Sequence, residues 1–234
     1  MELEQASQVL EDNYQHIEAV HIPDEPLFVP KHFRFPRNSL QYFNKLLVPD
    51  GLIQSRVDHH AFEIYRYYKG ITAELQILVI MDGAFSFYSM LLNSIQKLIH
   101  CDNSLFKFRA HYVTLKTYVN DSPDKSRRVC PSVFKEEWIT NKKVLIIEDV
   151  YDTGNLMGQL LEVVGGFKPE ELNVAVLVHK RNPVNVSFRF SARWTGFVLP
   201  NEFIVGCGID YSERFRELGH IVSLSPAGIE EFKK

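Results

Sequence analysis

The side chains of this chain that are best suited to chemistry lie in one short stretch. Four apolar residues, 144–147, lead into the adjacent carboxylates Glu148 and Asp149, and a third carboxylate, Asp152, opens an Asp-Thr-Gly turn. Carboxylates can hold a divalent cation, bind sugar hydroxyls or accept a proton. The turn can bring backbone N–H groups to a helix N-terminus, where a phosphate binds readily. This pattern therefore indicates a site for a phosphorylated ligand.

The element that must position these acids is a buried strand. An unbroken apolar run such as 144–147 is typical of a strand covered on both faces, as in a parallel α/β sheet. Ligands of such sheets bind outside the carboxyl ends of the strands, where the three acids would lie. A solvated acidic loop is the alternative. Asp152 has a further alternative, the N-cap of the next helix, and a carboxylate can combine this role with proton transfer.

Composition limits the class of protein. The chain has 234 residues, 45% of them hydrophobic, which fits one α/β domain with a small extra lobe. A formal net charge of −3 gives the whole chain no electrostatic case for binding nucleic acid, and no stretch approaches the ~18 apolar residues of a membrane span. The N-terminus has no signal-peptide pattern, and Cys101, Cys130 and Cys207 are widely spaced, as is typical of reduced thiols. We therefore expect a cytoplasmic protein.

Alternating strand and helix patterns predict right-handed crossovers and a mainly parallel sheet flanked by helices. We expect helices at 39–47, 54–68, 85–99 and 156–164, and strands at 75–81, 106–118, 144–147, 174–178, 194–198, 203–205 and 221–224. Residues 119–142 are polar and contain two prolines, which is typical of a mobile loop over a site.

Further motifs accompany the acidic stretch. They are 48–53 and 115–121 before it, and 174–181, 196–200 and 203–211 after it, the last continuing to His220. In this order, over roughly residues 27–234, the motifs resemble the hypoxanthine-guanine phosphoribosyltransferases of the type I phosphoribosyltransferase family. The resemblance implies Mg²⁺-dependent transfer of 5-phosphoribosyl from phosphoribosyl diphosphate to N9 of hypoxanthine or guanine, which gives IMP or GMP and diphosphate.

The resemblance implies roles for the acidic stretch. Glu148 and Asp149 would bind the ribose hydroxyls and the metal ion. Asp152 would take the proton from purine N7 as N9 attacks. The 5′-phosphate would be bound by the backbone of Asp152, Thr153, Gly154, Asn155 and Leu156.

The implied purine site lies on later motifs. The Lys180 ammonium would donate to the 6-oxo group, which favours 6-oxopurines over adenine. Phe203 would stack on the purine, and Ile204 would offer backbone groups to the base edge. Without the motifs, an exposed lysine at a strand end and a core phenylalanine are the alternatives. The implied catalytic pair is Asp152 and Lys180, and Asp210, next to the purine, joins Glu148 and Asp149 as a metal ligand.

Other matching residues would serve the diphosphate and exclude water. Gly83 and Arg216 would bind the diphosphate. Asp82 stands in the same turn where the family has a lysine, and two like charges about 5 Å apart cost on the order of 3 kcal/mol at an effective dielectric near 20. Thr117 and Tyr118 match the Ser-Tyr pair at the tip of the closing loop of the family.

The phosphate loop also departs from the family. Leu156 replaces a threonine whose hydroxyl meets the 5′-phosphate, and one lost charge-assisted hydrogen bond is worth roughly 1.5–3 kcal/mol. Tyr151 replaces a common aliphatic residue near the ribose. The main-chain cradle is unaffected by both changes. We therefore expect a divergent member with weakened binding of phosphoribosyl diphosphate.

The resemblance also implies an organisation and partners. Residues 1–37 form an N-terminal arm that contributes to a hood, and residues 38–234 form the phosphoribosyltransferase domain, with a core at about 52–190 and a base-binding hood segment at about 191–234. The partners are phosphoribosyl diphosphate, 6-oxopurines, IMP or GMP, and further copies of the chain in a homodimer or homotetramer, without nucleic acid or membrane. Acceptance of xanthine stays open.

Two other functions are alternatives to transferase activity. A catalytically weak or inactive purine-nucleotide-binding paralogue with a regulatory role is the alternative that Asp82 and Leu156 favour. An NAD-dependent dehydrogenase is disfavoured because no Gly-x-Gly-x-x-Gly follows the first strand.

Overall fold

Six parallel strands form the main sheet of the computed structural model, which describes residues 18–72, 74–115, 117–119, 127–183 and 191–233. Every neighbouring pair in this sheet is parallel, in the order β1-β9-β8-β7-β3-β4. The strands, in chain order, are β1 (Val20–His21), β3 (Glu74–Met81), β4 (Lys107–Thr114), β7 (Lys143–Tyr151), β8 (Glu171–Lys180) and β9 (Trp194–Leu199).

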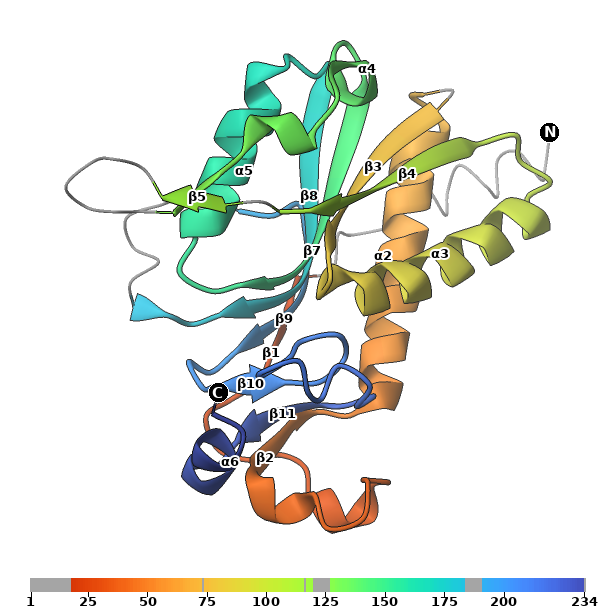
Figure 1. Cartoon of the computed structure of the whole chain (residues 1–234). Helices are drawn as coiled ribbons and strands as arrows, with labels where there is room; N and C mark the ends of the chain where they lie inside the picture. The colour runs from red at the N-terminus through yellow and green to blue at the C-terminus, as the bar shows by residue number, and fades with distance from the viewer. Residues whose placement is uncertain (1–17, 73, 116, 120–126, 184–190, 234) are drawn as a thin grey trace.

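Helices cover both faces of this sheet, as strands that are apolar on both faces require. Figure 1 shows α2 (Asp50–Lys69) and α3 (Ala84–Cys101) on one side and α5 (Asn155–Gly166) with the short α4 (Glu136–Ile139) on the other. The run 144–147 is almost completely buried between these layers. The predicted α/β class with a mainly parallel sheet is therefore confirmed. Among the described residues, no helix combines the length and the apolar character that crossing a bilayer requires.

A smaller antiparallel sheet forms the predicted hood lobe, drawn below the main sheet in Figure 1. Its strands are β10 (Ile204–Val205), β11 (Ile221–Leu224) and β2 (Phe43–Val48), so segments far apart in the sequence build it together. Helix α6 (Pro226–Glu231) follows β11 and is capped by the Ser225 hydroxyl. A third sheet pairs β5 (Thr117–Val119) with β6 (Arg127–Val129).

Three local predictions were wrong. Residues 39–47 are not a helix, because a 3-10 turn at Leu40–Tyr42 leads directly into β2. A short apolar run fits either period, and here pairing with the distant β11 decides in favour of a strand. The strand expected at 106–118 ends at Thr114, and β5 belongs to a different sheet.

The third wrong prediction concerns the segment 119–142. Its described part is not a continuous loop, since it contains β6, a 3-10 helix at Pro131–Val133 and α4. Residues 120–126 of the expected loop, like residues 1–17 of the predicted arm, lie outside the described residues.

The parallel register gathers the chemically interesting segments at one edge of the main sheet. Val79 of β3 pairs with Ile147 of β7, and Tyr151 of β7 pairs with His179 of β8. The carboxyl ends of β3, β7 and β8 therefore lie close to one another. In open α/β sheets this edge is where ligands bind.

Candidate active site

The turn after β7 forms a cradle for an anion. Gly154 is the N-cap of α5 and has a φ of 81°, in the left-handed region that favours glycine. No side chain among the described residues caps this helix, so the backbone N–H groups of its first turn are available. These groups and the helix dipole favour a phosphate. Asp152 does not cap the helix, and that alternative was wrong.

A cavity of about 130 Å³ opens at this turn and is lined by Glu148, Val150, Tyr151, Asp152, Thr153, Gly154, Leu156 and Met157. Tyr151 is buried against the turn, because a Cβ on Gly154 would lie 2.7 Å from its hydroxyl oxygen. A larger side chain at this position would require both a strained left-handed backbone and a shift of the Tyr151 hydroxyl. Leu156, in the first turn of α5, leaves 41% of its surface exposed. The cavity therefore contains members of both the predicted ribose site and the predicted phosphate loop.

Glu148 is a buried acid with an unsatisfied oxygen. The residue is only 6% exposed, and its Oε2 atom has no hydrogen-bond partner among the described residues. Burial, with the neighbouring Asp149 charge as the second cause, raises the pKa of this carboxyl well above its ordinary value. A ribose hydroxyl or a hydrated cation at Oε2 would compensate for this loss of solvation.

Asp149 lies against the turn that follows β3. A Cβ on Gly83 would come within 1.9 Å of its Oδ2 atom, so the predicted diphosphate glycine and the predicted ribose acid are in direct contact. Asp82 precedes this glycine in the same turn, and the Met81–Asp82 peptide bond is cis. Asp82 is therefore the sequence neighbour of the glycine that Asp149 contacts.

A loop of the hood reaches the same turn. A Cβ on Gly208 would lie 2.2 Å from the carbonyl oxygen of Gly83. Arg216 holds this loop, because its Nη1 donates to the Gly208 carbonyl at 2.7 Å and its Nη2 pairs with Asp210 Oδ1 at 2.8 Å. The other oxygen, Asp210 Oδ2, accepts from the Glu213 N–H. The hood loop therefore brings Asp210 and Arg216 near the turn that carries Gly83, the predicted diphosphate glycine.

Asp152 and Lys180, the predicted catalytic pair, contact each other directly. Lys180 Nζ lies 3.0 Å from Asp152 Oδ2. Asn182, which the sequence reasoning missed, donates from Nδ2 to Asp152 Oδ1 at 2.7 Å. The available signal was its position two residues beyond Lys180, at the carboxyl end of a buried strand.

Two of the predicted purine residues, Phe203 and Ile204, lie on the hood, whereas Lys180 ends β8 of the main sheet. Phe203 is 45% exposed, and its ring packs edge-on against Tyr211 at a centroid distance of 5.0 Å, so the ring has a surface available to a ligand. Ile204 is buried and begins β10. Thr117 and Tyr118 belong to β5, but their side chains lie outside the described part of the chain.

The donor set fits a magnesium ion that is shared with a ligand. Mg²⁺ prefers oxygen, and it usually binds one or two carboxylates together with water and substrate phosphates. The unsatisfied Glu148 Oε2 and the adjacent Asp149 are such donors. Within the described ranges, however, no three His, Cys, Asp or Glu side chains group closely enough to hold a metal ion. The three predicted ligands, Asp210 included, therefore do not form one cluster.

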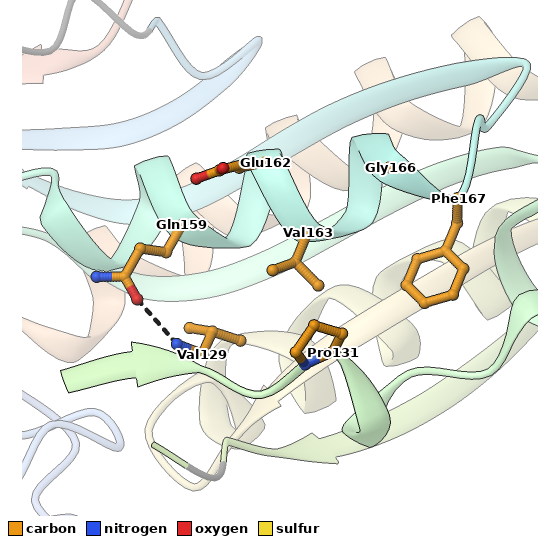
Figure 2. A pocket seen from close by; sticks show the side chains of 7 residues that line it. All are labelled: Val129, Pro131, Gln159, Glu162, Val163, Gly166 and Phe167. Atoms are coloured by element: carbon orange, nitrogen blue, oxygen red, sulfur yellow. Dashed lines mark hydrogen bonds between the residues drawn. The ribbon is translucent and has the colours of Figure 1, made fainter. Parts of the chain in front are cut away.

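A second cavity, of about 430 Å³, lies outside this site, between α5 and the segment that follows β6. Figure 2 shows its lining: Val129, Pro131, Gln159, Glu162, Val163, Gly166 and Phe167. The Gln159 Oε1 atom accepts from the Val129 N–H at 2.8 Å. One side chain of α5 therefore holds the end of β6 beside the cavity.

Known proteins share this sequence pattern and this architecture. A phosphoribosyl transferase domain is matched over residues 50–212. Hypoxanthine-guanine phosphoribosyltransferases of Bos taurus and Homo sapiens are 31% and 30% identical, over 90% of this chain and 94% of each relative. The hypoxanthine-guanine-xanthine phosphoribosyltransferase of Plasmodium falciparum (isolate K1 / Thailand) is 30% identical over 92% of this chain and 91% of its own length.

A solved structure shares the fold. The crystal structure of the hypoxanthine-guanine phosphoribosyltransferase of Schistosoma mansoni, in complex with IMP, superposes with a TM-score of 0.76 over 92% of this chain and 100% of that chain. Sequence identity in this comparison is 23%.

Proposed function

Because the chain belongs to the phosphoribosyl transferase family, as a divergent member, we propose that it transfers 5-phosphoribosyl from phosphoribosyl diphosphate to N9 of a 6-oxopurine. The observation that carries this proposal is the meeting of three features at one sheet edge. They are the uncapped N-terminus of α5, the Glu148–Asp149 pair and the Asp152–Lys180 pair. A phosphate, a ribose and a polar base edge would each find a suitable partner there.

The residues present suit the charges that such a reaction develops. The bond between ribose C1′ and diphosphate breaks, which leaves positive charge on the sugar, and magnesium, when bound, neutralises the leaving diphosphate. Glu148 and Asp149 would bind the ribose hydroxyls and Mg²⁺. The backbone at 153–156 would hold the 5′-phosphate, and Gly83 and Arg216 would bind the diphosphate. Asp152 would accept the proton from purine N7, since a general base must lie within hydrogen-bond reach of that proton.

The purine would bind between the main sheet and the hood. Phe203 would stack on the ring, and Lys180 would donate to the 6-oxo group. Lys180 Nζ now contacts Asp152, so base binding would move the ammonium from the carboxylate to the purine oxygen. This exchange would leave the carboxylate free to accept a proton only when a base is present.

One assay tests the proposal directly. The protein is incubated with phosphoribosyl diphosphate, Mg²⁺ and each of hypoxanthine, guanine and xanthine, with adenine as the control base. We expect nucleotide from hypoxanthine or guanine and none from adenine. The xanthine reaction resolves the specificity that the sequence left open. Absence of product from every 6-oxopurine at high protein concentration would contradict the proposal.

A specific observation favours one second candidate, a purine-nucleotide-binding protein with little or no catalysis. Asp82 places a carboxylate in the turn that meets Asp149, where an anionic ligand must bind. Leu156 offers an apolar side chain to the cavity at the phosphate turn. Tight binding of IMP or GMP by calorimetry, without turnover, would favour this candidate.

The implied homodimer or homotetramer stays a prediction, which sedimentation velocity tests. The cytoplasmic location also stays a prediction, which cell fractionation tests.

A further inference from the structure

We propose that Asn182 is a positioning residue that holds the Asp152 carboxylate in the orientation needed for proton transfer. The inference rests on the proposed function, in which Asp152 is the base. Its direct support is a short hydrogen bond of 2.7 Å from Asn182 Nδ2 to Asp152 Oδ1. Lys180 occupies the other oxygen, Oδ2, at 3.0 Å. Two donors from one strand end therefore hold the two carboxylate oxygens separately.

The strand end that carries Asn182 is itself firmly held. The Asn182 N–H donates to the Lys180 carbonyl, and the Arg181 N–H donates to the Leu199 carbonyl, both at 2.8 Å. The Arg181 guanidinium donates to the Ile22 carbonyl at 2.6 Å and pairs with Asp24 Oδ1 at 2.6 Å. These contacts tie the end of β8 to β9 and to the N-terminal segment. A donor on this segment can therefore define the direction of a carboxylate that it contacts.

Asp152 needs such an orienting group because its own turn does not supply one. The residue does not cap α5. The N-cap of that helix is Gly154, and no side chain among the described residues caps it. Its side chain is 43% exposed, so packing alone does not fix the carboxylate. When Lys180 moves to a purine oxygen, Oδ2 becomes available to the N7 proton. The Asn182 amide then remains on Oδ1 and keeps the carboxylate in place.

The chemistry of an amide suits this task. A neutral donor fixes the direction of a carboxylate, whereas a second cation would stabilise its charge strongly and make it a weaker base. A hydrogen bond to a charged partner is also strong enough to restrict rotation. Asn182 therefore differs from Lys180 in role. Lys180 recognises the purine, and Asn182 keeps the carboxylate of the general base, Asp152, aligned.

The kinetic test is a double-mutant cycle with Asp152. We expect Asn182→Leu, which has a similar volume and no donor, to lower kcat by about 10- to 100-fold. The KM values for hypoxanthine and phosphoribosyl diphosphate should stay within about threefold, because Asn182 acts through Asp152 rather than on substrate. Asn182→Gln, which keeps the amide, should recover part of the loss. Asp152→Asn alone should lose about 10²- to 10⁴-fold.

The decisive comparison is Asn182→Leu in the Asp152→Asn background. If Asn182 acts only through Asp152, the second substitution adds almost nothing to the loss. Equal losses in the two backgrounds would show an independent structural role and would overturn the proposal. A rise in KM with unchanged kcat would overturn it as well, because that pattern indicates direct substrate binding.

A structural arm separates this inference from the proposed function. In a crystal structure of Asn182→Leu, we expect the Asp152 carboxylate to leave its present orientation while Lys180 and the phosphate turn stay in place. An unchanged carboxylate would contradict the positioning role even if the protein has no transferase activity. Calorimetry with IMP provides the folding control, since Asn182→Leu should bind IMP within about threefold of the wild type. A wild type without turnover would contradict the proposed function alone.

Discussion

At the scale of single residues, Glu148 is a buried acid whose charged form is costly. Its pKa is raised well above the ordinary 4.5, chiefly by burial, so the folded protein retains this proton to a higher pH than the unfolded chain. The folded state therefore binds more protons than the unfolded state as pH rises above about 4.5. Burial of Glu148 therefore costs little while the carboxyl is protonated at low pH. The free energy of unfolding falls as pH rises toward the raised folded-state pKa.

Glu148→Gln should therefore stabilise the ligand-free protein at pH 7, since glutamine has no charge to desolvate. One unit of pKa shift corresponds to about 1.4 kcal/mol, so we expect a Tm increase of at least roughly 2–4 °C for a chain of this size. This gain in stability should shrink toward pH 4.5. Turnover should fall, because the proposed function assigns the Glu148 carboxylate to the ribose hydroxyls. Scanning calorimetry from pH 5 to 8 measures the effect.

The matched control for this prediction is Glu25→Gln, because the Glu25 side chain is exposed. This variant should leave both the Tm and its pH dependence nearly unchanged. A Glu148→Gln protein that is less stable than the wild type at pH 7 would contradict the prediction, because it would mean that Glu148 makes favourable contacts that glutamine cannot replace.

At the scale of elements, the turn before α5, which is the proposed phosphate site, has a glycine in a conformation that other residues rarely adopt. Gly154 has a φ of 81° and lies against Tyr151, whereas Gly165, on the same helix α5, has nothing within 4 Å of its Cβ position. We expect Gly154→Ala to cost about 1–2 kcal/mol for the left-handed backbone, and more for the contact with Tyr151. It should also lower affinity for phosphoribosyl diphosphate at least tenfold.

Gly165→Ala is the control on the same element. Alanine in a helix interior is favoured over glycine by roughly 0.5–1 kcal/mol, so this variant should be slightly more stable and bind the ligand normally. Urea unfolding and calorimetry compare the two proteins. Similar ligand affinities for both variants would contradict an anion site at this turn.

Helix α5 also contacts β6 through Gln159, and Figure 2 draws the hydrogen bond of this side chain with Val129. The Val129 N–H donates to Gln159, and Val129 pairs with Thr117 of β5. We expect Gln159→Leu to increase hydrogen exchange at the Val129 amide about fivefold, because one net hydrogen bond contributes roughly 1 kcal/mol.

Gln159→Glu keeps an acceptor oxygen at the same position and serves as the control. Its Val129 amide should exchange at nearly the wild-type rate in hydrogen–deuterium exchange at pH 7. Fast exchange in the wild type itself would mean that Gln159 does not hold the hairpin in solution.

At the scale of the whole molecule, the hood is tied to the main sheet by charged side chains. Lys45 of β2 pairs with Glu202 Oε1 at 2.5 Å and donates to the Asp24 carbonyl at 2.8 Å. Asp24 in turn pairs with Arg181 at the end of β8. This chain of contacts joins both lobes across the N-terminal segment, and Glu202 immediately precedes the predicted purine-stacking Phe203.

The two ion pairs should differ in strength. The Lys45–Glu202 pair is mostly shielded, with side chains 24% and 20% exposed, whereas Asp24 is 80% exposed. Exposed pairs contribute little because solvent and salt screen them. We expect Glu202→Gln to lower the free energy of unfolding by about 1 kcal/mol and to weaken IMP binding several-fold. Asp24→Asn should change unfolding by less than about 0.5 kcal/mol. The reverse order in urea unfolding would contradict this assignment.

Local patterns were sufficient for the elements whose apolar periods are unambiguous. The bounds predicted for β3, α3 and α5 lie within two residues of the observed ones. The elements β7, β8 and α2 were predicted at the right places but too short, since β7 continues four residues beyond its apolar run and α2 begins four residues earlier. The acidic strand end and the glycine turn after it were likewise readable, because neighbours in the sequence build them. The sequence alone therefore determined the fold class and the chemistry that one sheet edge would offer.

Tertiary structure decided what depends on distant partners. Strand β2 was predicted as a helix because its short apolar run suits either period until β11 pairs with it. The contacts of Asn182 with Asp152 and of Gly208 with Gly83 join segments that meet only after the parallel register forms and the hood folds over it. Local propensity acts over a few residues, whereas side-chain orientation at this site is imposed by groups about 30 to 125 positions away, and only the folded chain brings these groups together.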